Sequence, residues 1–215
     1  MKNLLFPLLV FFVIISAKGQ FNRVEYLQNF DKKTFHWGYY ISLNQTGFKN
    51  VIDEKYVGSP TNSLGFNVGL VGDLRLNKNI NLRLEPGMFS SAEKGFTPPG
   101  SQEALTWNST YFHLPFLLKF STDRLKNYRP FVLTGISYDY NFKNTPENLT
   151  NAGYSIKKNQ FMLEYGIGVD FYLHYFKFSP SIRGIYSLTD ELSTPSMESE
   201  MQLQTRGIFL SLCFE

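Results

Sequence analysis

The residues with the greatest scope for chemistry in this sequence are its three histidines, His36, His113 and His174. His36 and His174 fall at the ends of predicted strands, and His113 falls on the inward face of one. Catalysis of the protease or acyltransferase type would need a serine and a carboxylate beside one of these histidines. The spacing of serine, histidine and acidic residues along the sequence places no such set together. The sequence therefore predicts no catalytic residues, although an enzyme acting on lipid or peptide through His113 remains an alternative.

Other familiar site patterns are missing from the sequence. It contains neither an H-x-x-x-H spacing nor a Cys/His cluster, so we predict no metal site. Cys213 is the single cysteine and cannot form an internal disulfide. The glycines inside predicted strands favour relief of crowding at barrel bends over a cofactor cradle, and we predict no cofactor; they are Gly65, Gly69, Gly72, Gly166 and Gly168.

The first nineteen residues read as a secretory signal. Lys2 supplies a positive start, the run 4–15 is apolar apart from one proline, and Ala17 and Gly19 place small residues before a cut at Gln20. The run is shorter than the roughly 20 residues that a spanning helix needs. We therefore predict a signal peptide at 1–19, with an N-terminal anchor helix as the alternative. No cysteine stands directly after the run, so we predict no lipoprotein anchor.

The charge of the remaining chain is nearly balanced. Removing Lys2 and Lys18 from the 21 basic residues leaves 19 against 18 acidic ones, a net charge of +1. No basic patch argues for nucleic acid, and nothing points to a small-molecule substrate. The aromatic fraction of 17% is high, and no helix-length apolar run follows residue 15. An exported, aromatic-rich chain without disulfides or spanning helices is typical of an outer-membrane barrel.

Apolar and polar residues alternate with a period of two along most of the chain, which predicts strands. We predict eight, and an even number returns both chain ends to the periplasm. They are joined alternately by short turns and by long connections, a pattern typical of bacterial barrels with short periplasmic turns and long extracellular loops. The predicted strands are 36–44, 64–76, 79–90, 109–121, 128–140, 159–173, 175–188 and 202–214.

The polar faces of these strands carry charges of both signs. Eight strands enclose an interior that side chains just fill, and unpaired charges there would be costly. The sequence thus predicts an all-β, eight-stranded antiparallel transmembrane barrel with a closed, salt-bridged lumen and no open pore. A soluble, lipocalin-like barrel with solvated faces is the alternative. The predicted lumen charges are Asp73, Arg75, Arg83, Glu85, Lys119, Glu164, Asp170, Lys177 and Arg183.

Two features fit the pattern less well. Pro86, Pro115 and Pro180 fall inside predicted strands, where each removes a ladder donor, and bulges beside them would accommodate them. The strand predicted at 128–140 does not alternate cleanly, so its two faces stay unassigned.

Several runs resemble the small outer-membrane barrels abundant in Bacteroidetes: GFNVGLVGDLRLNKNINLRLEPGMF, YFHLPFLLKFS, YRPFVLTGISYDY and FMLEYGIGVDFYL. A narrower resemblance rests on NFDKKTFHWGYYISLN, residues 29–44, followed by GFK. It looks like the PorT (SprT) proteins of the type IX secretion and gliding machinery. The terminal Phe-Glu departs from the aromatic residue that usually ends such barrels.

The resemblance implies a non-enzymatic role in export of proteins across the outer membrane. It implies a periplasmic segment at 20–35 before a barrel at 36–215, with outer-membrane lipid and other secretion-apparatus proteins as partners. Phe30, Phe35 and Trp37 are the candidate partner contacts, and the alternative for Phe35 and Trp37 is an interfacial aromatic girdle. General anchoring or adhesion at the outer membrane is the rival function.

Overall fold

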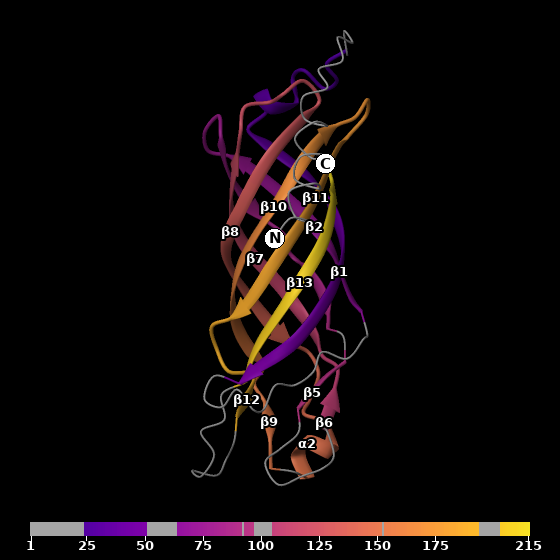
Figure 1. Cartoon of the computed structure of the whole chain (residues 1–215), viewed down its shortest axis with the longest axis vertical. Helices are drawn as coiled ribbons and strands as arrows, with labels where there is room; N and C mark the ends of the chain where they lie inside the picture. Colours follow the sequence, from indigo (N-terminus) through magenta and orange to yellow (C-terminus); the bar gives the residue numbers. More distant parts are fainter. Residues whose placement is uncertain (1–23, 51–63, 92, 97–104, 152, 194–202) are drawn as a thin grey trace, which may run out of the picture.

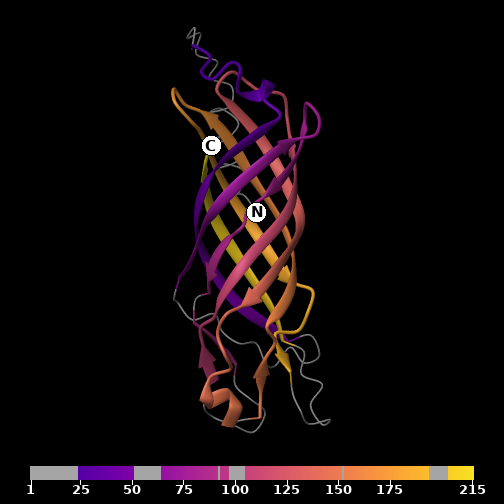
Figure 2. The same ribbon diagram turned by 180° about the vertical axis from the view of Figure 1, so that it is seen from behind.

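The protein forms a tall closed barrel with one folded layer at its lower end in the view of Figure 1, and Figure 2 shows the same wall from behind. The computed structural model describes residues 24–50, 64–91, 93–96, 105–151, 153–193 and 203–215. Among these residues, no helix is long and apolar enough to cross a membrane.

Every strand of the barrel pairs antiparallel with its neighbours, and β1 closes the ring by pairing with both β13 and β2. The sheet contains nine segments, and because β3 and β4 continue one strand, eight staves form the wall. In ring order these are β1 (Phe35–Asn50), β13 (Leu203–Phe214), β11 (Lys177–Ser187), β10 (Asn159–Tyr172), β8 (Tyr128–Asn141), β7 (Thr110–Ser121), β3 (Ile80–Leu84) with β4 (Gly87–Ser90), and β2 (Gly65–Arg75). The predicted fold is confirmed.

The alternation of side chains is what separates the two faces of the wall. Burial along β7 and β10 switches at nearly every residue, as the two-residue period requires. The same holds for β8, whose faces the sequence left open: Arg129, Leu133 and Asp139 point inward, and Val132 and Ile136 point outward. Its inward face mixes apolar and charged side chains, which is why a simple polar-versus-apolar reading did not separate it.

The expected bulges at the strand prolines are absent, and this corrects the sequence prediction. On both sides of Pro86 the pairing of β3 and β4 with β2 keeps one register, and β7 and β11 likewise keep theirs past Pro115 and Pro180. The carbonyl of Pro86 still accepts from the Leu70 N–H at 2.9 Å. Each proline therefore costs the wall one donor without inserting an extra residue.

The outer surface of the wall is apolar around its circumference. Large aliphatic side chains stand exposed on staves all around the ring, for example Leu70 on β2, Ile167 on β10 and Ile208 on β13, at 61%, 64% and 63% exposure. Exposed aromatic residues stand at both ends of this surface, including Trp37 at 75% and Tyr175 at 86% near the short turns and Phe66 at 57% near the long loops. An apolar band with an aromatic border is the surface that an outer-membrane barrel presents to lipid.

The long connections build a small layer beyond the other end of the barrel (Figure 1). Trp107, Leu149 and Ile156 form its core, with Leu105 and Tyr154 packed against them. β1 also runs on to Asn50, six residues beyond the predicted end, because β13 continues to pair with it there. The elements of the layer are β5 (Lys94–Phe96), β6 (Leu105–Trp107), α2 (Glu147–Asn151), β9 (Ser155–Ile156) and β12 (Leu192–Ser193).

Candidate functional site

The lumen is filled by ionised side chains from inward positions on the staves. Nearest the short turns, Arg83 lies 2.6 Å from Asp73 and 2.6 Å from Glu215, while Lys177 lies 2.8 Å from Glu215. All four side chains are almost completely buried, with exposures of 4% or less. Each charge has a partner of opposite sign, so the interior avoids the cost of an isolated buried ion.

A neighbouring pair lies on the β7 and β10 side of the same level. Lys119 Nζ sits 2.7 Å from both carboxylate oxygens of Asp170, and Ser179 Oγ donates to Asp170 at 2.6 Å. The Lys119 ammonium also lies 4.1 Å from the centre of the Phe131 ring, a distance suited to a cation–π contact.

A second charged level follows toward the extracellular end. Arg183 makes a two-pronged contact with Glu85 at 2.5 and 2.8 Å. His113 stands between two carboxylates, with Nδ1 2.6 Å from Asp139 and Nε2 3.2 Å from Glu164. Arg83 links the two levels through Glu85, at 3.6 Å.

An apolar level closes the lumen on the extracellular side of the charges. It consists of inward-facing rings and aliphatic chains in mutual contact, with the Phe89 ring 5.3 Å from both Tyr111 and Phe209. The Tyr111 hydroxyl then donates to Glu191 at 2.8 Å, and the Thr205 hydroxyl donates to the same carboxylate. The full set of this level is Phe89, Tyr111, Met162, Ile185 and Phe209.

The chain segment that precedes β1 closes the end with the short turns. It contains a single helical turn, η1 (Phe30–Lys32), which lies at the top of Figure 1. Phe30 stacks on His36 at 4.0 Å between ring centres, and its carbonyl oxygen lies 2.8 Å from His36 Nε2.

Asp31 joins this segment to three staves of the barrel. It accepts from the Tyr172 hydroxyl at 2.7 Å and pairs with Arg124 at 3.4 Å and Arg129 at 3.6 Å. Arg75 donates to the Asp31 backbone carbonyl. The segment is therefore held across the mouth by charged hydrogen bonds as well as by ring stacking.

The predicted lumen charges divide into two groups. Eight of the nine meet inside the barrel in the contacts described above. Arg75 does not: it is half-buried at the mouth and donates to the carbonyl oxygens of Asp31 and Asn77. It stands on the inward face of β2, but that strand ends at Arg75, beyond the reach of the charged levels.

The predicted partner contacts also divide. Phe30 turns into the mouth, where His36 and Tyr172 border it. Phe35 and Trp37 lie on the outward face of β1 with exposures of 56% and 75%. That position suits the interfacial girdle that the sequence left as their alternative role.

The sequence analysis did not predict four members of the charged network in the lumen and at its mouth. Asp139 stands on the strand whose faces were unassigned, and His113 was considered only as a catalyst. Asp31 lies outside any strand, so no periodicity could place it. Glu215 continues the inward series of Ser211 and Cys213 on β13, a signal that was available. Phe214 points the other way and contacts Tyr39 and Phe178.

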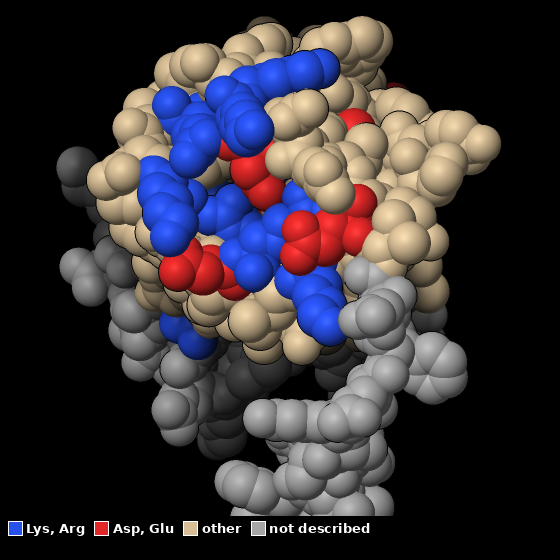
Figure 3. Space-filling model, turned by 90° about the horizontal axis from the view of Figure 1, so that it is seen from above, with Lys and Arg blue, Asp and Glu red and all other residues tan. Residues whose placement is uncertain are grey.

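The rim at this end carries mixed charge with basic residues prominent around the mouth, as Figure 3 shows from above. Lys78 pairs with Asp123 at 2.9 Å, and both side chains are about two thirds exposed, at 68% and 66%. Hydrogen bonds from Lys78 and Asn79 lower the pKa of Asp123. Lys32, Lys33 and Lys126 stand exposed on the same end.

The histidine on the inner wall is enclosed by carboxylates. His113 is 2% exposed, and the groups within hydrogen-bonding range of its two nitrogens are carboxylates and not a hydroxyl nucleophile. Among the described residues, no group of three or more His, Cys, Asp and Glu could hold a metal ion. The charged levels, the apolar level and the segment at the mouth together leave the lumen packed.

A family model described as the outer membrane protein beta-barrel domain matches residues 20–193. The chain belongs to this family. Its place is accordingly the outer membrane, with the short turns in the periplasm and the long loops outside. A search of curated proteins returned no match.

Solved structures of outer-membrane barrels are similar to this one at low identity. The N-terminal barrel domain of OprF from Pseudomonas aeruginosa has 11% identity and a TM-score of 0.38, with 82% of this chain and 99% of that chain covered. OprG from Pseudomonas aeruginosa has 13% identity and a TM-score of 0.44, covering 82% and 92%. Ail of Yersinia pestis, solved with the heparin analogue sucrose octasulfate, has 15% identity and a TM-score of 0.43, covering 85% and 99%.

Proposed function

We propose that this barrel is a non-enzymatic, non-conducting accessory of type IX protein secretion that works by binding partner proteins at its periplasmic mouth. The observation that carries the proposal is the packed lumen closed by the segment at residues 24–33. A barrel whose interior is occupied by paired charges offers no path for cargo and no open pocket for a substrate. What it offers other proteins is its two ends.

The periplasmic end is the better candidate for partner binding. The run that resembles PorT proteins, residues 29–44, includes residues 29–33 of the segment that lies across this mouth. Lys32 and Lys33 stand exposed there, at the same end as Lys126, and this surface suits an acidic segment of a periplasmic partner. Phe30 anchors the segment from below, so a partner would meet its lysines and not its ring.

The first test is the proteome of the culture medium and cell surface in a deletion strain and its parent. Joint loss of many large exported proteins supports a secretion role, and matching proteomes would reject it. A charge reversal then locates the surface. Lys32→Glu with Lys33→Glu should reduce export while the barrel still inserts.

A matched pair on the opposite end serves as the control. Lys157→Glu with Lys158→Glu makes the same charge change on exposed lysines beside β9, in the extracellular layer. We expect normal export from this variant. Equal export defects in both pairs, or in neither, would argue against a periplasmic docking surface.

A second candidate function, anchoring or adhesion at the cell surface, has one observation in its favour. The extracellular loops build a layer with its own buried core instead of short exposed turns. Replacing residues 143–158 with a short Gly/Ser linker removes α2 and β9 from that layer. Lost surface attachment with intact secretion would favour adhesion over the export role.

A further inference from the structure

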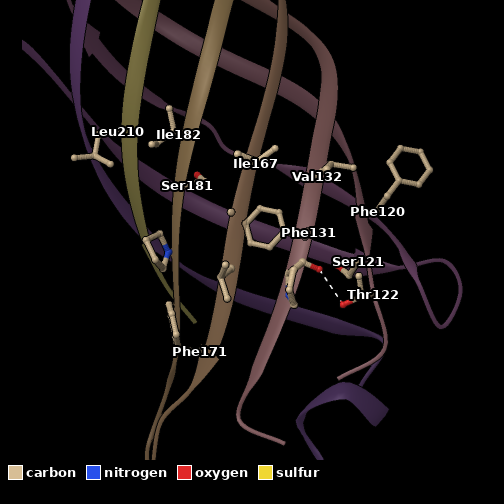
Figure 4. Close-up of a pocket in the computed structure, with 14 residues that line it drawn as sticks. Phe120, Ser121, Thr122, Phe131, Val132, Ile167, Phe171, Ser181, Ile182 and Leu210 are labelled. Carbon is tan, nitrogen blue, oxygen red and sulfur yellow. Dashed lines mark hydrogen bonds between the residues drawn. The ribbon is translucent and has the colours of Figure 1, made fainter. Parts of the chain in front are cut away.

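The outer wall of the barrel contains an apolar trough that the proposed function does not use. It crosses β7, β8, β10 and β11 on the lipid-facing side, near the periplasmic end, and has a volume of about 790 Å³. Figure 4 shows its lining, with Phe120, Val132, Ile167 and Ile182 along one side and Phe171 toward the other. This volume lies within the range of small-molecule sites in proteins.

The register of the strands explains why the wall is hollow here. Val132, Ile167, Ile182 and Leu210 are successive lateral partners and form one raised row. Phe171 stands between Tyr128 and Phe178 in a second raised row. Between the two rows lie Pro130, Val169 and Pro180, which are half-buried, whereas nearly all residues of the raised rows stand exposed. Outward rows along a strand are about 7 Å apart, so a shallow middle row leaves a channel across the staves.

The middle row also holds a backbone acceptor without a ladder donor. The Thr122 N–H donates to the Pro130 carbonyl at 3.0 Å, so the bonding edge of Pro130 faces β7. Val169 lies opposite Pro130 and must turn its own bonding edge the other way, toward β11. The pairs Gly168–Ser181 and Phe171–Phe178 have the same register, and continuing it between them puts Pro180 opposite Val169. Proline has no N–H, so the Val169 carbonyl receives no hydrogen bond from its partner. Within a membrane, an acceptor left in this way is unfavourable.

The place of the trough in the membrane limits what can fill it. It opens on the apolar band and ends at Thr122, in the β7–β8 turn at the periplasmic rim, where Figure 4 shows the Thr122 hydroxyl bonded to the Pro130 carbonyl. Exposed Lys126 lies in the same turn. An occupant should therefore combine a long apolar chain with a polar, phosphate-bearing end.

We propose that this trough binds one phospholipid of the periplasmic leaflet, with an acyl chain between the two raised rows. Its headgroup end faces the β7–β8 turn, where Thr122 and Lys126 lie. The trough is thus a specific lipid site on a wall that otherwise contacts lipid without selection.

Native mass spectrometry of the detergent-solubilised protein, titrated with palmitoyl-oleoyl phosphatidylethanolamine, tests this proposal. The wild type should bind a first lipid at least tenfold more tightly than later ones. Val169→Trp fills the trough and should abolish that first step. Ile208→Trp adds the same ring to an outward position of β13 outside the trough, and should bind as the wild type does.

Folding of each variant is checked by its altered gel mobility before and after heating. If Val169→Trp does not fold, Pro180→Leu replaces it, because that change fills the trough and restores an N–H opposite Val169. Tight first-lipid binding that survives either folded variant would overturn the proposal. So would a wild type that binds lipids in a purely statistical distribution.

Discussion

Replacing Arg83 with methionine should destabilise the barrel far more than any surface charge change. The guanidinium lies 2.6 Å from Asp73, 2.6 Å from Glu215 and 3.6 Å from Glu85, with no exposed surface. Without it, Glu215 keeps Lys177 and Glu85 keeps Arg183. Asp73 keeps the side-chain amide of Asn81 at 2.6 Å but loses its cation.

One buried carboxylate is therefore left without its counter-ion. Removing one partner of a buried ion pair costs about 3–5 kcal/mol, because the remaining charge is neither solvated nor compensated. The free energy of unfolding falls by about 2 kcal/mol per molar urea, so this loss lowers the urea midpoint of unfolding by about 2 M. Unfolding in lipid vesicles, followed by tryptophan fluorescence and by heat-dependent gel mobility, measures it.

Two further variants separate the ion pair from simple loss of packing. Asp73→Asn together with Arg83→Met removes both charges and should recover at least half of the lost midpoint. Lys78→Met breaks the exposed pair with Asp123 and should leave the midpoint unchanged, since water already solvates both groups. Midpoints for Arg83→Met and Lys78→Met that agree within error would refute the idea that the lumen network stabilises the barrel.

Three other predictions address the wall, the mouth and the pore. Gly135→Ala should prevent stable folding, because the new Cβ would lie 2.0 Å from the Phe116 carbonyl oxygen. The control is Gly72→Ala, whose Cβ would meet the Phe35 ring at an ordinary 3.5 Å and which should fold with an unchanged urea midpoint. Equal midpoints for the two variants would contradict the steric argument. Asp31→Asn removes the charge that Arg124 and Arg129 share, so trypsin should cut after Lys32 and Lys33 several times faster in vesicles than in the wild type; an unchanged rate would mean that Phe30 alone holds the segment. In planar bilayers the wild type should show no steady conductance, since paired charges and the apolar level fill the lumen; long-lived open channels would show that these levels can part.

The eight-stave fold was predictable from the sequence because its signal is local and repeated. Most staves carry their own two-residue alternation, and each connection carries its own length, so no long-range contact is needed to count strands or to order short and long loops. Balanced charge on the inward faces was enough to predict a closed lumen, because an eight-stranded barrel cannot hydrate so many ions. His113 and the lumen charges on clearly alternating strands were therefore placed inward from the sequence alone.

Partner choice within the lumen was decided by the tertiary structure. Arg83 meets Glu215, which is 132 positions away in the chain, and Tyr172 meets Asp31 across 141 positions. These pairs depend on the closure of β1 onto β13 and on the height of each stave, which no local pattern encodes. The same closure brings the segment before β1 over the mouth. There Phe30 stacks on His36, and Arg75 donates to the Asp31 carbonyl instead of joining the charged levels of the lumen.

The sequence by itself determined the strand count, the inward charges and the apolar outer wall, because each depends on the side-chain period of a single strand. The tertiary structure alone decided which charges pair, where the prolines line up and what closes the mouth. Pro130, Val169 and Pro180 stand far apart in the chain and become one row only through the register of three staves. Register is a relation between strands, and it is fixed when the ring closes.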